Sequence, residues 1–482
     1  MNLFAPLPPE TRRLLDGIPA LIDKAFPLPG RFRSRLPSDV AELSRLLTSG
    51  RGERGLSYLG RPNLLSAYLR FFLPWNLYRL CRLLPGLGIE LRAGDAVTDL
   101  GCGPLTFAGA LWICRPDLRA LPLEFNCIDR SGPALEAGRE FFAALASATL
   151  AGEKCPWKIR AVKAELGAGK ARQGERSREG GGANEGALER GANGRGGEHG
   201  CAHSGARGAR SAALVCAINV FNEMHGDVSR ANSESLKRGA EKSARMLEGY
   251  ASAESAVLVV EPGFPRCGEF VGLLRAELMA RGRRPLSPCP HDGACPMLEA
   301  PAPGGARAGK KRWCHFAFET EDAPKDLQRL SRSAGLPKER AVLSFALAGK
   351  RGAAAGAKAP PLEGGQGTAA AGAGAKTPPP EGGQGAASAK ASAKAPPGGG
   401  ERKGEAFAGH GASVLRVISD AFALPGKRLG RYCCSRQGLA LLAGEEEAIG
   451  KAASGALVSA AFRKGERDPK SGALLARPEA GE

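Results

Sequence analysis

The stretch "VTDLGCGPLTF", residues 97–107, is the strongest indication of the fold of this chain. It places Asp99, Gly101 and Gly103 where an apolar strand ends and a helix-like segment begins. Glycines at such an exit let the backbone turn tightly and approach a ligand, and the following helix offers free N–H groups. The stretch therefore predicts the ligand-binding turn of a strand–turn–helix unit.

The next strand supports this prediction. It ends in "CIDRS" at 127–131, which places Asp129 where an acid can accept hydrogen bonds from ribose hydroxyls. Strand-like and helix-like segments then alternate at about 30 residues per unit, through "SAALVCAINVFNEM" and "SAVLVVEPG". Because the strands are apolar throughout, helices are expected on both faces of the sheet. The predicted fold class is α/β, with a doubly wound parallel sheet.

The order "DLGCG", without a G-x-G-x-x-G run, resembles class I S-adenosylmethionine (SAM) methyltransferases more than NAD enzymes. On this interpretation Asn219 and Asn222, after the strand at 211–218, are candidate SAM contacts, although either could instead cap the next helix. Glu223 and His225 are the candidate bases. The strand lacks an Asn/Asp-Pro-Pro-aromatic run and a proline–cysteine pair, so cofactor binding is better supported here than catalysis.

Composition divides the chain into several regions. The Gly- and Arg-rich insertion and the Gly/Ala/Pro/Lys-rich linker cannot bury enough apolar surface to offset the entropy of ordering them. The predicted regions are an N-terminal helical region (1–90), the SAM-methyltransferase-like domain (91–285) with a disordered insertion (165–211), a Cys-rich metal-binding extension (286–350), a disordered linker (351–408), a C-terminal β module completing the metal site (409–445) and a tail (446–482).

Charge and hydropathy restrict the partners. The chain of 482 residues carries a formal net charge of +19, which suits a polyanion because neutralised phosphates release counterions. Pro8, Pro9 and the acids Glu10 and Asp16 argue against a signal or transit peptide at the N-terminus. The sequence contains no charge-free apolar run of about 18 residues, so it predicts no membrane span. We expect a cytoplasmic protein with an RNA partner, no DNA partner and no membrane contact.

Clustered cysteines predict a metal site. Cys289 and Cys295 flank the turn "PHDGA", too long for a zinc-ribbon knuckle, and Cys314 follows in "RWCHF". "RYCCSRQG" adds Cys433 and Cys434. Four thiolates suit either zinc or an iron–sulfur cluster, and the wide, irregular spacing favours the larger cluster. His291 and His315 leave a mixed Cys/His zinc site open.

Several of these motifs together resemble a known family. "DLGCGPLTF", "NVFNE", "VVEPGFP", "PCPHDGACP" and "RWCHFAF", in this order, are similar to methyltransferase-like proteins that assist small-ribosomal-subunit assembly, which have mitochondrial and bacterial members. The resemblance covers residues 35–445 outside the two low-complexity segments. It implies a SAM-methyltransferase fold with an N-terminal helical cap, a small extension holding a four-cysteine [4Fe–4S] cluster, and binding of small-subunit ribosomal RNA or a pre-ribosomal particle.

The resemblance also assigns residues. Cys289, Cys295 and Cys314 match the first three cluster ligands, and Cys434, four residues before Gly438, is preferred to Cys433 as the fourth. Leu105 stands where many members have a further glycine, and its side chain is expected to crowd the ligand's carboxylate.

The sequence leaves several functions open. The first is a ribosome-assembly factor that binds small-subunit RNA, and the second is an active SAM-dependent rRNA methyltransferase. Zinc-dependent RNA binding and cluster-dependent redox chemistry rank below these two. Radical SAM chemistry ranks last, because the cysteines are far from C-x3-C-x2-C spacing. The oligomeric state is left open too.

Overall fold

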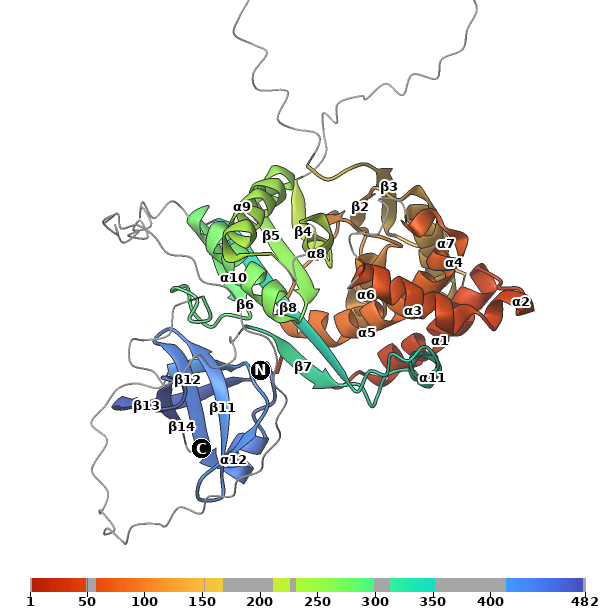
Figure 1. Cartoon of the computed structure of the whole chain (residues 1–482). Coiled ribbons are helices and arrows are strands. Elements are labelled where there is room, and N and C mark those ends of the chain that lie inside the picture. The colour runs from red at the N-terminus through yellow and green to blue at the C-terminus, as the bar shows by residue number, and fades with distance from the viewer. Residues whose placement is uncertain are drawn as a thin grey trace, which may run out of the picture. The chain divides into compact units, whose positions relative to one another are not determined.

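The computed structural model describes residues 2–48, 50, 58–150, 152–167, 211–225, 231–298, 313–351 and 413–479 (Figure 1). The predicted insertion (165–211) and linker (351–408) lie almost wholly outside the described residues. The described residues before position 352 and after position 412 belong to one compact unit. None of the described helices is both long and apolar enough to cross a membrane.

The N-terminal region is helical in its described part. Apolar residues three and four apart give α1 (Pro9–Ala25) one buried face, with Leu15, Ile18 and Ile22 inside. A nearly continuous helix runs through α4 (Pro62–Ala67), η3 (Tyr68–Phe72) and α5 (Leu73–Leu83). η3 is a single π turn just before Pro74, whose missing N–H breaks the regular bonding. The other helices are α2 (Gly30–Arg33), α3 (Leu36–Leu47), η2 (Tyr58–Gly60) and η4 (Leu84–Leu87).

A mostly parallel sheet forms the centre of the α/β domain. Its strand order is β3-β2-β1-β4-β5-β8-β6, and β7 pairs with β8. β1 to β5 are mutually parallel, whereas β8 runs antiparallel to β5 and β6. The strands are β1 (Ala96–Leu100), β2 (Glu124–Asp129), β3 (Lys158–Lys163), β4 (Ala212–Ile218), β5 (Ala251–Pro262), β6 (Arg283–Ser287), β7 (Phe316–Glu319) and β8 (Arg340–Arg351).

Helices cover both faces of this sheet (Figure 1), because its central strands bury apolar side chains on both sides. One apolar core includes residues of α5, α6 and α7, and the other includes residues of α9 and α10. The order reverses between β1 and β4, the switch point where such sheets bind ligands. The predicted class I methyltransferase-like α/β fold is confirmed. Its further helices are α6 (Thr106–Cys114), η5 (Pro116–Leu118), α7 (Gly132–Thr149), α8 (Phe221–Met224), α9 (Ser233–Tyr250), α10 (Pro265–Ala280) and α11 (Lys325–Ser333).

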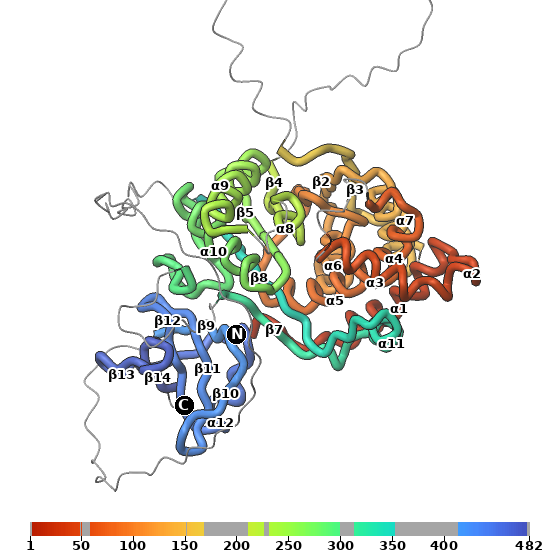
Figure 2. Tube along the Cα trace, viewed as in Figure 1, coloured from red at the N-terminus to blue at the C-terminus, as the bar shows by residue number. Residues whose placement is uncertain are grey.

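The C-terminal strands close into a barrel, which Figure 2 traces. The strand order is β11-β12-β14-β13-β9, and β9 pairs with β11 to close the barrel. β12 and β14 are parallel. β10 extends the sheet beside β11. Counted along the chain, the five barrel strands are β9, β11, β12, β13 and β14, and their order around the barrel is first, second, third, fifth, fourth. A helix, α12, lies between the third and fourth of them. This is the arrangement of an OB-fold. The elements are β9 (Ser413–Val417), β10 (Phe422–Leu424), β11 (Arg428–Ser435), β12 (Gly438–Glu445), α12 (Glu446–Gly450), β13 (Leu457–Arg467) and β14 (Leu474–Pro478).

This barrel corrects the predicted C-terminal boundaries. The predicted β module ended at residue 445, and residues 446–482 were expected to form a tail. The structure instead continues through β13 and β14 to Pro478, and both strands are needed to close the barrel. Alanines and charged residues interrupt these strands, so they lack the alternation of large apolar residues that indicates a strand in sequence.

Candidate functional site

The glycine turn after β1 requires its glycines. Gly101 and Gly103 adopt φ angles of +67° and +53°. A Cβ on Gly101 would lie 2.6 Å from Cγ2 of Val220, so a side chain does not fit there. The N–H groups of Gly101 and Cys102 donate to the carbonyl of Ile128 at the end of β2. The turn is therefore held against the neighbouring strand.

Asp129 lies beside this turn, as the sequence predicts. Its Oδ2 accepts a hydrogen bond from the N–H of Gly103 at 2.9 Å, and its Oδ1 accepts one from the N–H of Ser131 at 2.8 Å. The carboxylate at the end of β2 is thus oriented by backbone donors on both sides. Each oxygen keeps a further lone pair for a ligand hydroxyl.

Asp99 is a buried acid with an unused oxygen. The carboxyl is 1% exposed, and the thiol of Cys216 lies 3.4 Å from Oδ1. Within the described part of the chain, Oδ2 has no hydrogen-bond partner. Burial raises the pKa of Asp99 to about 7, and the charge of Asp129 adds to the shift. A buried carboxyl with a free oxygen favours a ligand that brings a donor or a positive charge.

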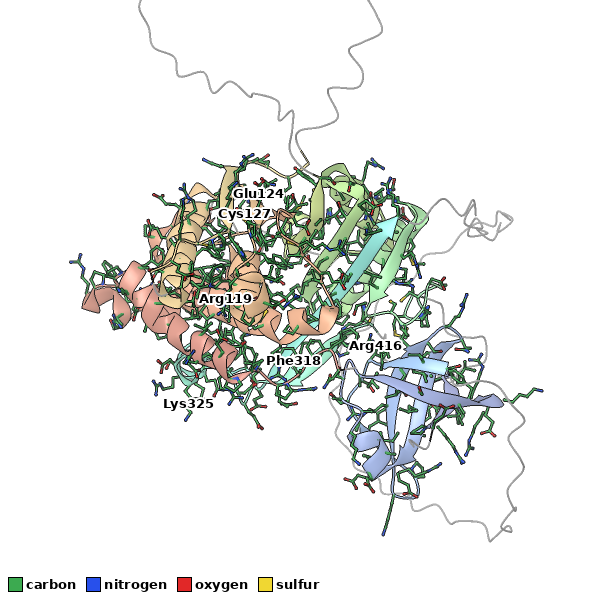
Figure 3. All side chains as sticks on the ribbon, turned by 180° about the vertical axis from the view of Figure 1, so that it is seen from behind. Arg119, Glu124, Cys127, Phe318, Lys325 and Arg416 are labelled. Atoms are coloured by element: carbon green, nitrogen blue, oxygen red, sulfur yellow. The ribbon has the colours of Figure 1, made fainter. Side chains whose placement is uncertain are left out.

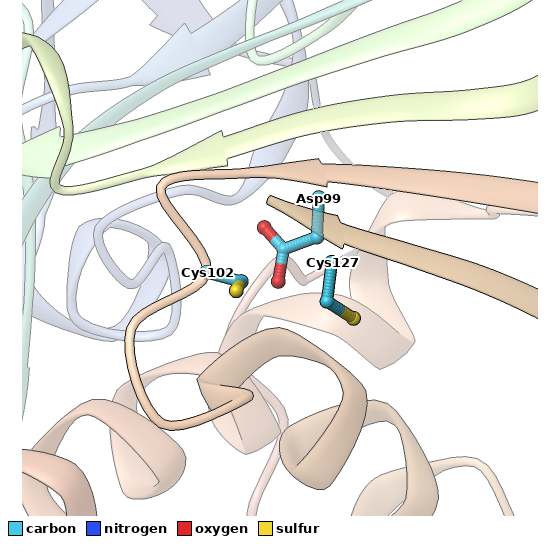
Figure 4. A group of neighbouring side chains, drawn as sticks. All are labelled: Asp99, Cys102 and Cys127. Carbon is cyan, nitrogen blue, oxygen red and sulfur yellow. The ribbon is translucent and has the colours of Figure 1, made fainter. Parts of the chain in front are cut away.

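Two thiols lie against the same carboxyl. Figure 4 shows the Asp99 carboxyl between the side chains of Cys102 and Cys127, which come from the turn and from β2. One oxygen and the two sulfurs lie within 4.8 Å of one another. Among the described residues, no other group of three His, Cys, Asp or Glu ligand atoms has this spacing.

The turn opens onto a small cavity of about 20 Å³, which is room for about one water molecule. A site for a drug-sized ligand is usually at least about 300 Å³. Tyr68 and Asn76 of the N-terminal helices lie over the turn, and the Tyr68 hydroxyl would be 3.8 Å from a Cβ on Gly103. SAM can enter only if this cover moves. The cavity is lined by Tyr68, Asn76, Asp99, Gly101, Cys102, Thr106, Phe107, Ile218 and Asn219.

Asn219 and Asn222 have different surroundings. Asn219 lines the cavity, adopts a left-handed φ of +58°, and its Nδ2 lies 3.5 Å from Oδ1 of Asn76. Asn222 is absent from the cavity lining, and its Nδ2 donates instead to Oε2 of Glu261 at 2.8 Å. Glu261 also accepts the N–H groups of Phe221 and Asn222, so this acid caps α8. Burial raises the pKa of Glu261 to about 7.

The two candidate bases also differ in position. Glu223 accepts a hydrogen bond from the hydroxyl of Tyr58 at 3.4 Å. The pKa of Tyr68, which lines the cavity, is raised mainly by burial and next by the negative charge of Glu223. His225 instead packs on α9, with its Nε2 2.7 Å from the hydroxyl of Ser243 and its ring stacked on Phe221. Burial lowers the pKa of His225. Neither residue lines the cavity.

Leu105 does not occupy the ligand side of the turn. Its φ is +57° and its side chain is fully buried. A Cβ on Gly138 of α7 would lie 2.8 Å from Cγ of Leu105, so the leucine packs into the core where α7 lacks a side chain. The expectation that Leu105 crowds the ligand is wrong, because the left-handed backbone turns its side chain away.

The four cysteines predicted as metal ligands come together. All four are free thiols. Burial raises the pKa of the Cys314 thiol well above its usual value, and three neighbouring thiols raise it further: Cys289, Cys295 and Cys434. Within the described part of the chain, these four thiols do not form a group whose ligand atoms all lie within 4.8 Å of one another.

Strand alternation separates the two adjacent cysteines of β11. Cys433 is fully buried in the barrel interior with Leu415 and Val417. Cys434 points to the opposite side, and its Sγ lies 3.2 Å from Nε2 of His291. Nδ1 of His291 is buried without a partner within the described residues. The sequence-based preference for Cys434 agrees with this geometry.

Two buried arginines accompany the cysteines. Arg275 donates from Nη2 to the carbonyl of His291 at 2.8 Å, and its charge opposes the burial that raises the pKa of Cys289. Arg416 of β9, labelled in Figure 3, donates to the carbonyls of Pro288 and Gly455. Burial lowers the pKa of Arg416 to about 10, and nearby thiols oppose that shift. Isolated arginines in a basic chain carry no signal, so the sequence did not reveal them.

Comparison with solved structures finds methyltransferases. The mitomycin 7-O-methyltransferase MmcR is 14% identical, with 58% of this chain and 71% of that chain covered and a TM-score of 0.27. A SAM-dependent methyltransferase from Aquifex aeolicus is 13% identical, with coverages of 52% and 89% and a TM-score of 0.22. The plantazolicin methyltransferase BpumL, solved with SAH, is 10% identical, with coverages of 71% and 98% and a TM-score of 0.23. These scores are low, so the fold class rests on the strand order of this chain.

Comparison with sequences is more specific. A search of curated proteins gives no match. A family model described as "Mitochondrial small ribosomal subunit Rsm22" matches residues 233–362, which include Cys289, Cys295 and Cys314 and exclude Cys434. Over residues 233–362 this chain matches the Rsm22 family model, which agrees there with the predicted resemblance to a small-ribosomal-subunit family.

Proposed function

We propose that this protein binds small-subunit ribosomal RNA during ribosome assembly, using a SAM-methyltransferase fold and an iron–sulfur cluster held by four cysteines. One observation carries the proposal: Cys289, Cys295 and Cys314, all inside the Rsm22 match, converge with Cys434, which lies outside it. The barrel thus supplies the fourth thiol to a site that the matched segment begins. Three segments far apart in sequence meet at this site.

The wide, irregular spacing of the four cysteines along the sequence favours a cluster over a single zinc ion. Four thiolates around an iron–sulfur core leave a net negative charge. Arg275 and Arg416 are the buried cations beside the thiols and would offset that charge. The Nε of Arg275, which has no partner among the described residues, is a donor left for the cluster.

The SAM site fits the proposal through its acids. Asp99 offers an unpartnered buried oxygen, and SAM carries an ammonium group and a sulfonium centre. Asp129 would accept the ribose hydroxyls from its position beside Gly103. When bound, SAM would supply an activated methyl group. The roles of the chain are to bind the cofactor, to orient it and, by displacing Tyr68 and Asn76, to admit it.

An RNA partner agrees with the charge. The formal net charge of +19 gives sequence-independent attraction to phosphates, and the family description places Rsm22 in the small ribosomal subunit. Such binding should weaken steeply as salt rises.

An active rRNA methyltransferase is the second candidate. The observation in its favour is that the glycine turn, Asp99 and Asp129 are all in place. Against it, the only ionisable side chains among the cavity-lining residues are Tyr68, Cys102 and Asp99, because Glu223 and His225 lie outside the lining. Methyl transfer to an atom that must lose a proton requires a base in reach.

The test combines metal, RNA and methyl readouts. The protein is purified without oxygen, its iron and zinc are measured, and it is incubated with small-subunit particles and methyl-labelled SAM. Iron with particle binding and no label in the RNA is expected for an assembly factor. Label in the RNA would establish the methyltransferase instead. Zinc in place of iron would refute the cluster, and failure to bind particles would refute the assembly role.

A further inference from the structure

The C-terminal barrel presents one outer face that its own core does not use. Side chains of β11 alternate, so Leu429 and Cys433 face the barrel interior while Gly430, Tyr432 and Cys434 face outward. β10 pairs beside the start of β11, opposite Gly430. In OB-folds the second and third strands, with the loop after the first, form the surface that binds oligonucleotides. β11, β12 and β10 occupy these places here.

Two aromatic rings lie on this face. The rings of Phe422 and Tyr432 are both half-buried, with centroids 5.0 Å apart and planes inclined at 34°, and Tyr432 also packs against the larger apolar core. Gly430 makes room for this arrangement, because a Cβ there would lie 3.1 Å from Cε2 of Phe422 and 2.9 Å from Cδ1 of Leu424. We call Phe422, Leu424 and Tyr432 the outer strip. Aromatic rings on such a face can stack with bases of any sequence.

Cations flank the outer strip. Lys427 and Arg428 are exposed in the turn between β10 and β11. Within the described residues, neither side chain takes part in an ion pair, and Arg428 donates only to the carbonyl of Pro425. The nearest acid in sequence, Asp420, is already paired with Arg340. Phosphates beside the outer strip would therefore meet unneutralised positive charge.

The charge of the barrel agrees with this local pattern. Residues 413–479 contain eleven Lys and Arg against seven Asp and Glu, a net charge of +4. A protein partner would need a broader apolar surface than two rings and one leucine provide. A single-stranded nucleic acid needs stacking surfaces with cations alongside, which the outer strip and the flanking Lys427 and Arg428 provide together.

We propose that the outer strip, with Lys427 and Arg428, binds a single-stranded segment of RNA by stacking bases on Phe422 and Tyr432 and holding the adjacent phosphates. This inference rests on the proposed RNA-binding function and names the surface that performs it. The OB-like topology is only an analogy. The inference itself depends on the side chains of Phe422, Tyr432, Lys427 and Arg428. Tyr432 and Cys434 share one face of β11, so the bound RNA would run toward the cysteine site.

The test uses the full chain with three probes: a short oligouridine, an RNA duplex of equal length, and small-subunit particles. Phe422→Ala should weaken oligouridine binding about 5- to 150-fold, the effect expected for losing one stacked base. Phe422→Leu keeps an apolar side chain in the same place and should show the loss even if the alanine variant folds poorly. Val414→Ala, at a 51% exposed apolar residue of β9, is the matched control and should change nothing.

The cations have a separate readout. Replacing Lys427 and Arg428 by alanine should reduce the salt dependence of oligouridine binding by about one to two counterions, while Lys464→Ala on β13 should leave the affinity nearly unchanged.

The two failures are distinguishable. Oligouridine affinity that is the same in the parent and in both Phe422 variants would overturn the outer strip, as would tighter binding of the duplex than of the oligouridine. A chain that binds particles and ignores oligouridine would remove this inference and leave the proposed function standing. A chain that binds neither would remove both.

Discussion

Nε2 of His291 lies 3.2 Å from Sγ of Cys434, although 143 residues separate the two in sequence. This contact joins the turn after β6 to β11 of the barrel. Arg416 adds a second link there, since its Nε donates to the carbonyl of Pro288 at 2.8 Å. The cysteine site is therefore built where two parts of the chain meet.

The two adjacent cysteines of β11 should behave differently on substitution. If the four cysteines hold a metal, Cys434→Ser should lose most of it, because the side chain faces Cys289, Cys295 and Cys314. Cys433→Ser should keep the metal and lower the free energy of unfolding by about 1 to 2 kcal/mol, because it places a hydroxyl in the barrel core. Metal content per chain after anaerobic purification measures the difference. Equal metal loss in both variants would contradict the assignment of Cys434.

Asp99 should control SAM affinity. Asp99→Asn removes the buried negative charge and should weaken SAM binding about 10- to 150-fold, the range for losing a charge-assisted hydrogen bond. Because the pKa of Asp99 lies at about 7, SAM affinity of the parent should rise as pH increases through 7 and level off above it. Calorimetric titration at several pH values measures both effects. Asp117→Asn, which changes an exposed acid, is the control. If Asp99→Asn leaves the pH dependence of SAM affinity unchanged, Asp99 does not control that affinity.

Glu261 should make stability fall with pH. The pKa of Glu261 is about 7 in the folded state, against 4.5 for an unperturbed glutamate. Between these pH values the folded state therefore keeps a proton that the unfolded state releases. The free energy of unfolding should therefore fall, by at most about 1.4 kcal/mol per pH unit, as pH rises from 4.5 to about 7. Glu261→Gln should remove this contribution. Urea unfolding at about pH 5, 6 and 7 checks it, and a parent–variant difference that is constant over this range would count against it.

Two glycines separate backbone strain from crowding. Gly101 and Gly88 have similar φ angles, +67° and +63°, but only Gly101 has a close neighbour, because a Cβ there would lie 2.6 Å from Cγ2 of Val220. Gly88→Ala should cost about 1 kcal/mol for the left-handed backbone. Gly101→Ala should cost about 2 to 4 kcal/mol, because the clash adds to the strain. Denaturant unfolding compares them, and similar losses would show that the turn can relax.

Local patterns allowed much of the fold to be predicted. Apolar runs, the glycine turn and the acid after β2 are all determined by residues close together in sequence, and the structure brings Asp99, Gly101 and Asp129 to one edge of the sheet. Parallel strands place their carboxyl ends at the same edge, so strand order suffices to bring these residues together.

Side-chain direction could be read only in part. Asn222 shares the strand exit with Asn219, yet Glu261, 39 residues further on, holds it away from the cavity. Leu105 faces the core because its backbone is left-handed, a conformation that local sequence does not predict for leucine.

Spacing along the chain is enough to predict the α/β class, the glycine turn, the acids at the strand ends and the set of candidate thiols. Only the tertiary structure decided that β13 and β14 close a barrel, that Cys434 faces the other thiols while Cys433 does not, and that Arg275 and Arg416 lie beside them. The physical reason is that these relationships depend on packing between segments far apart in the chain, which no local period encodes.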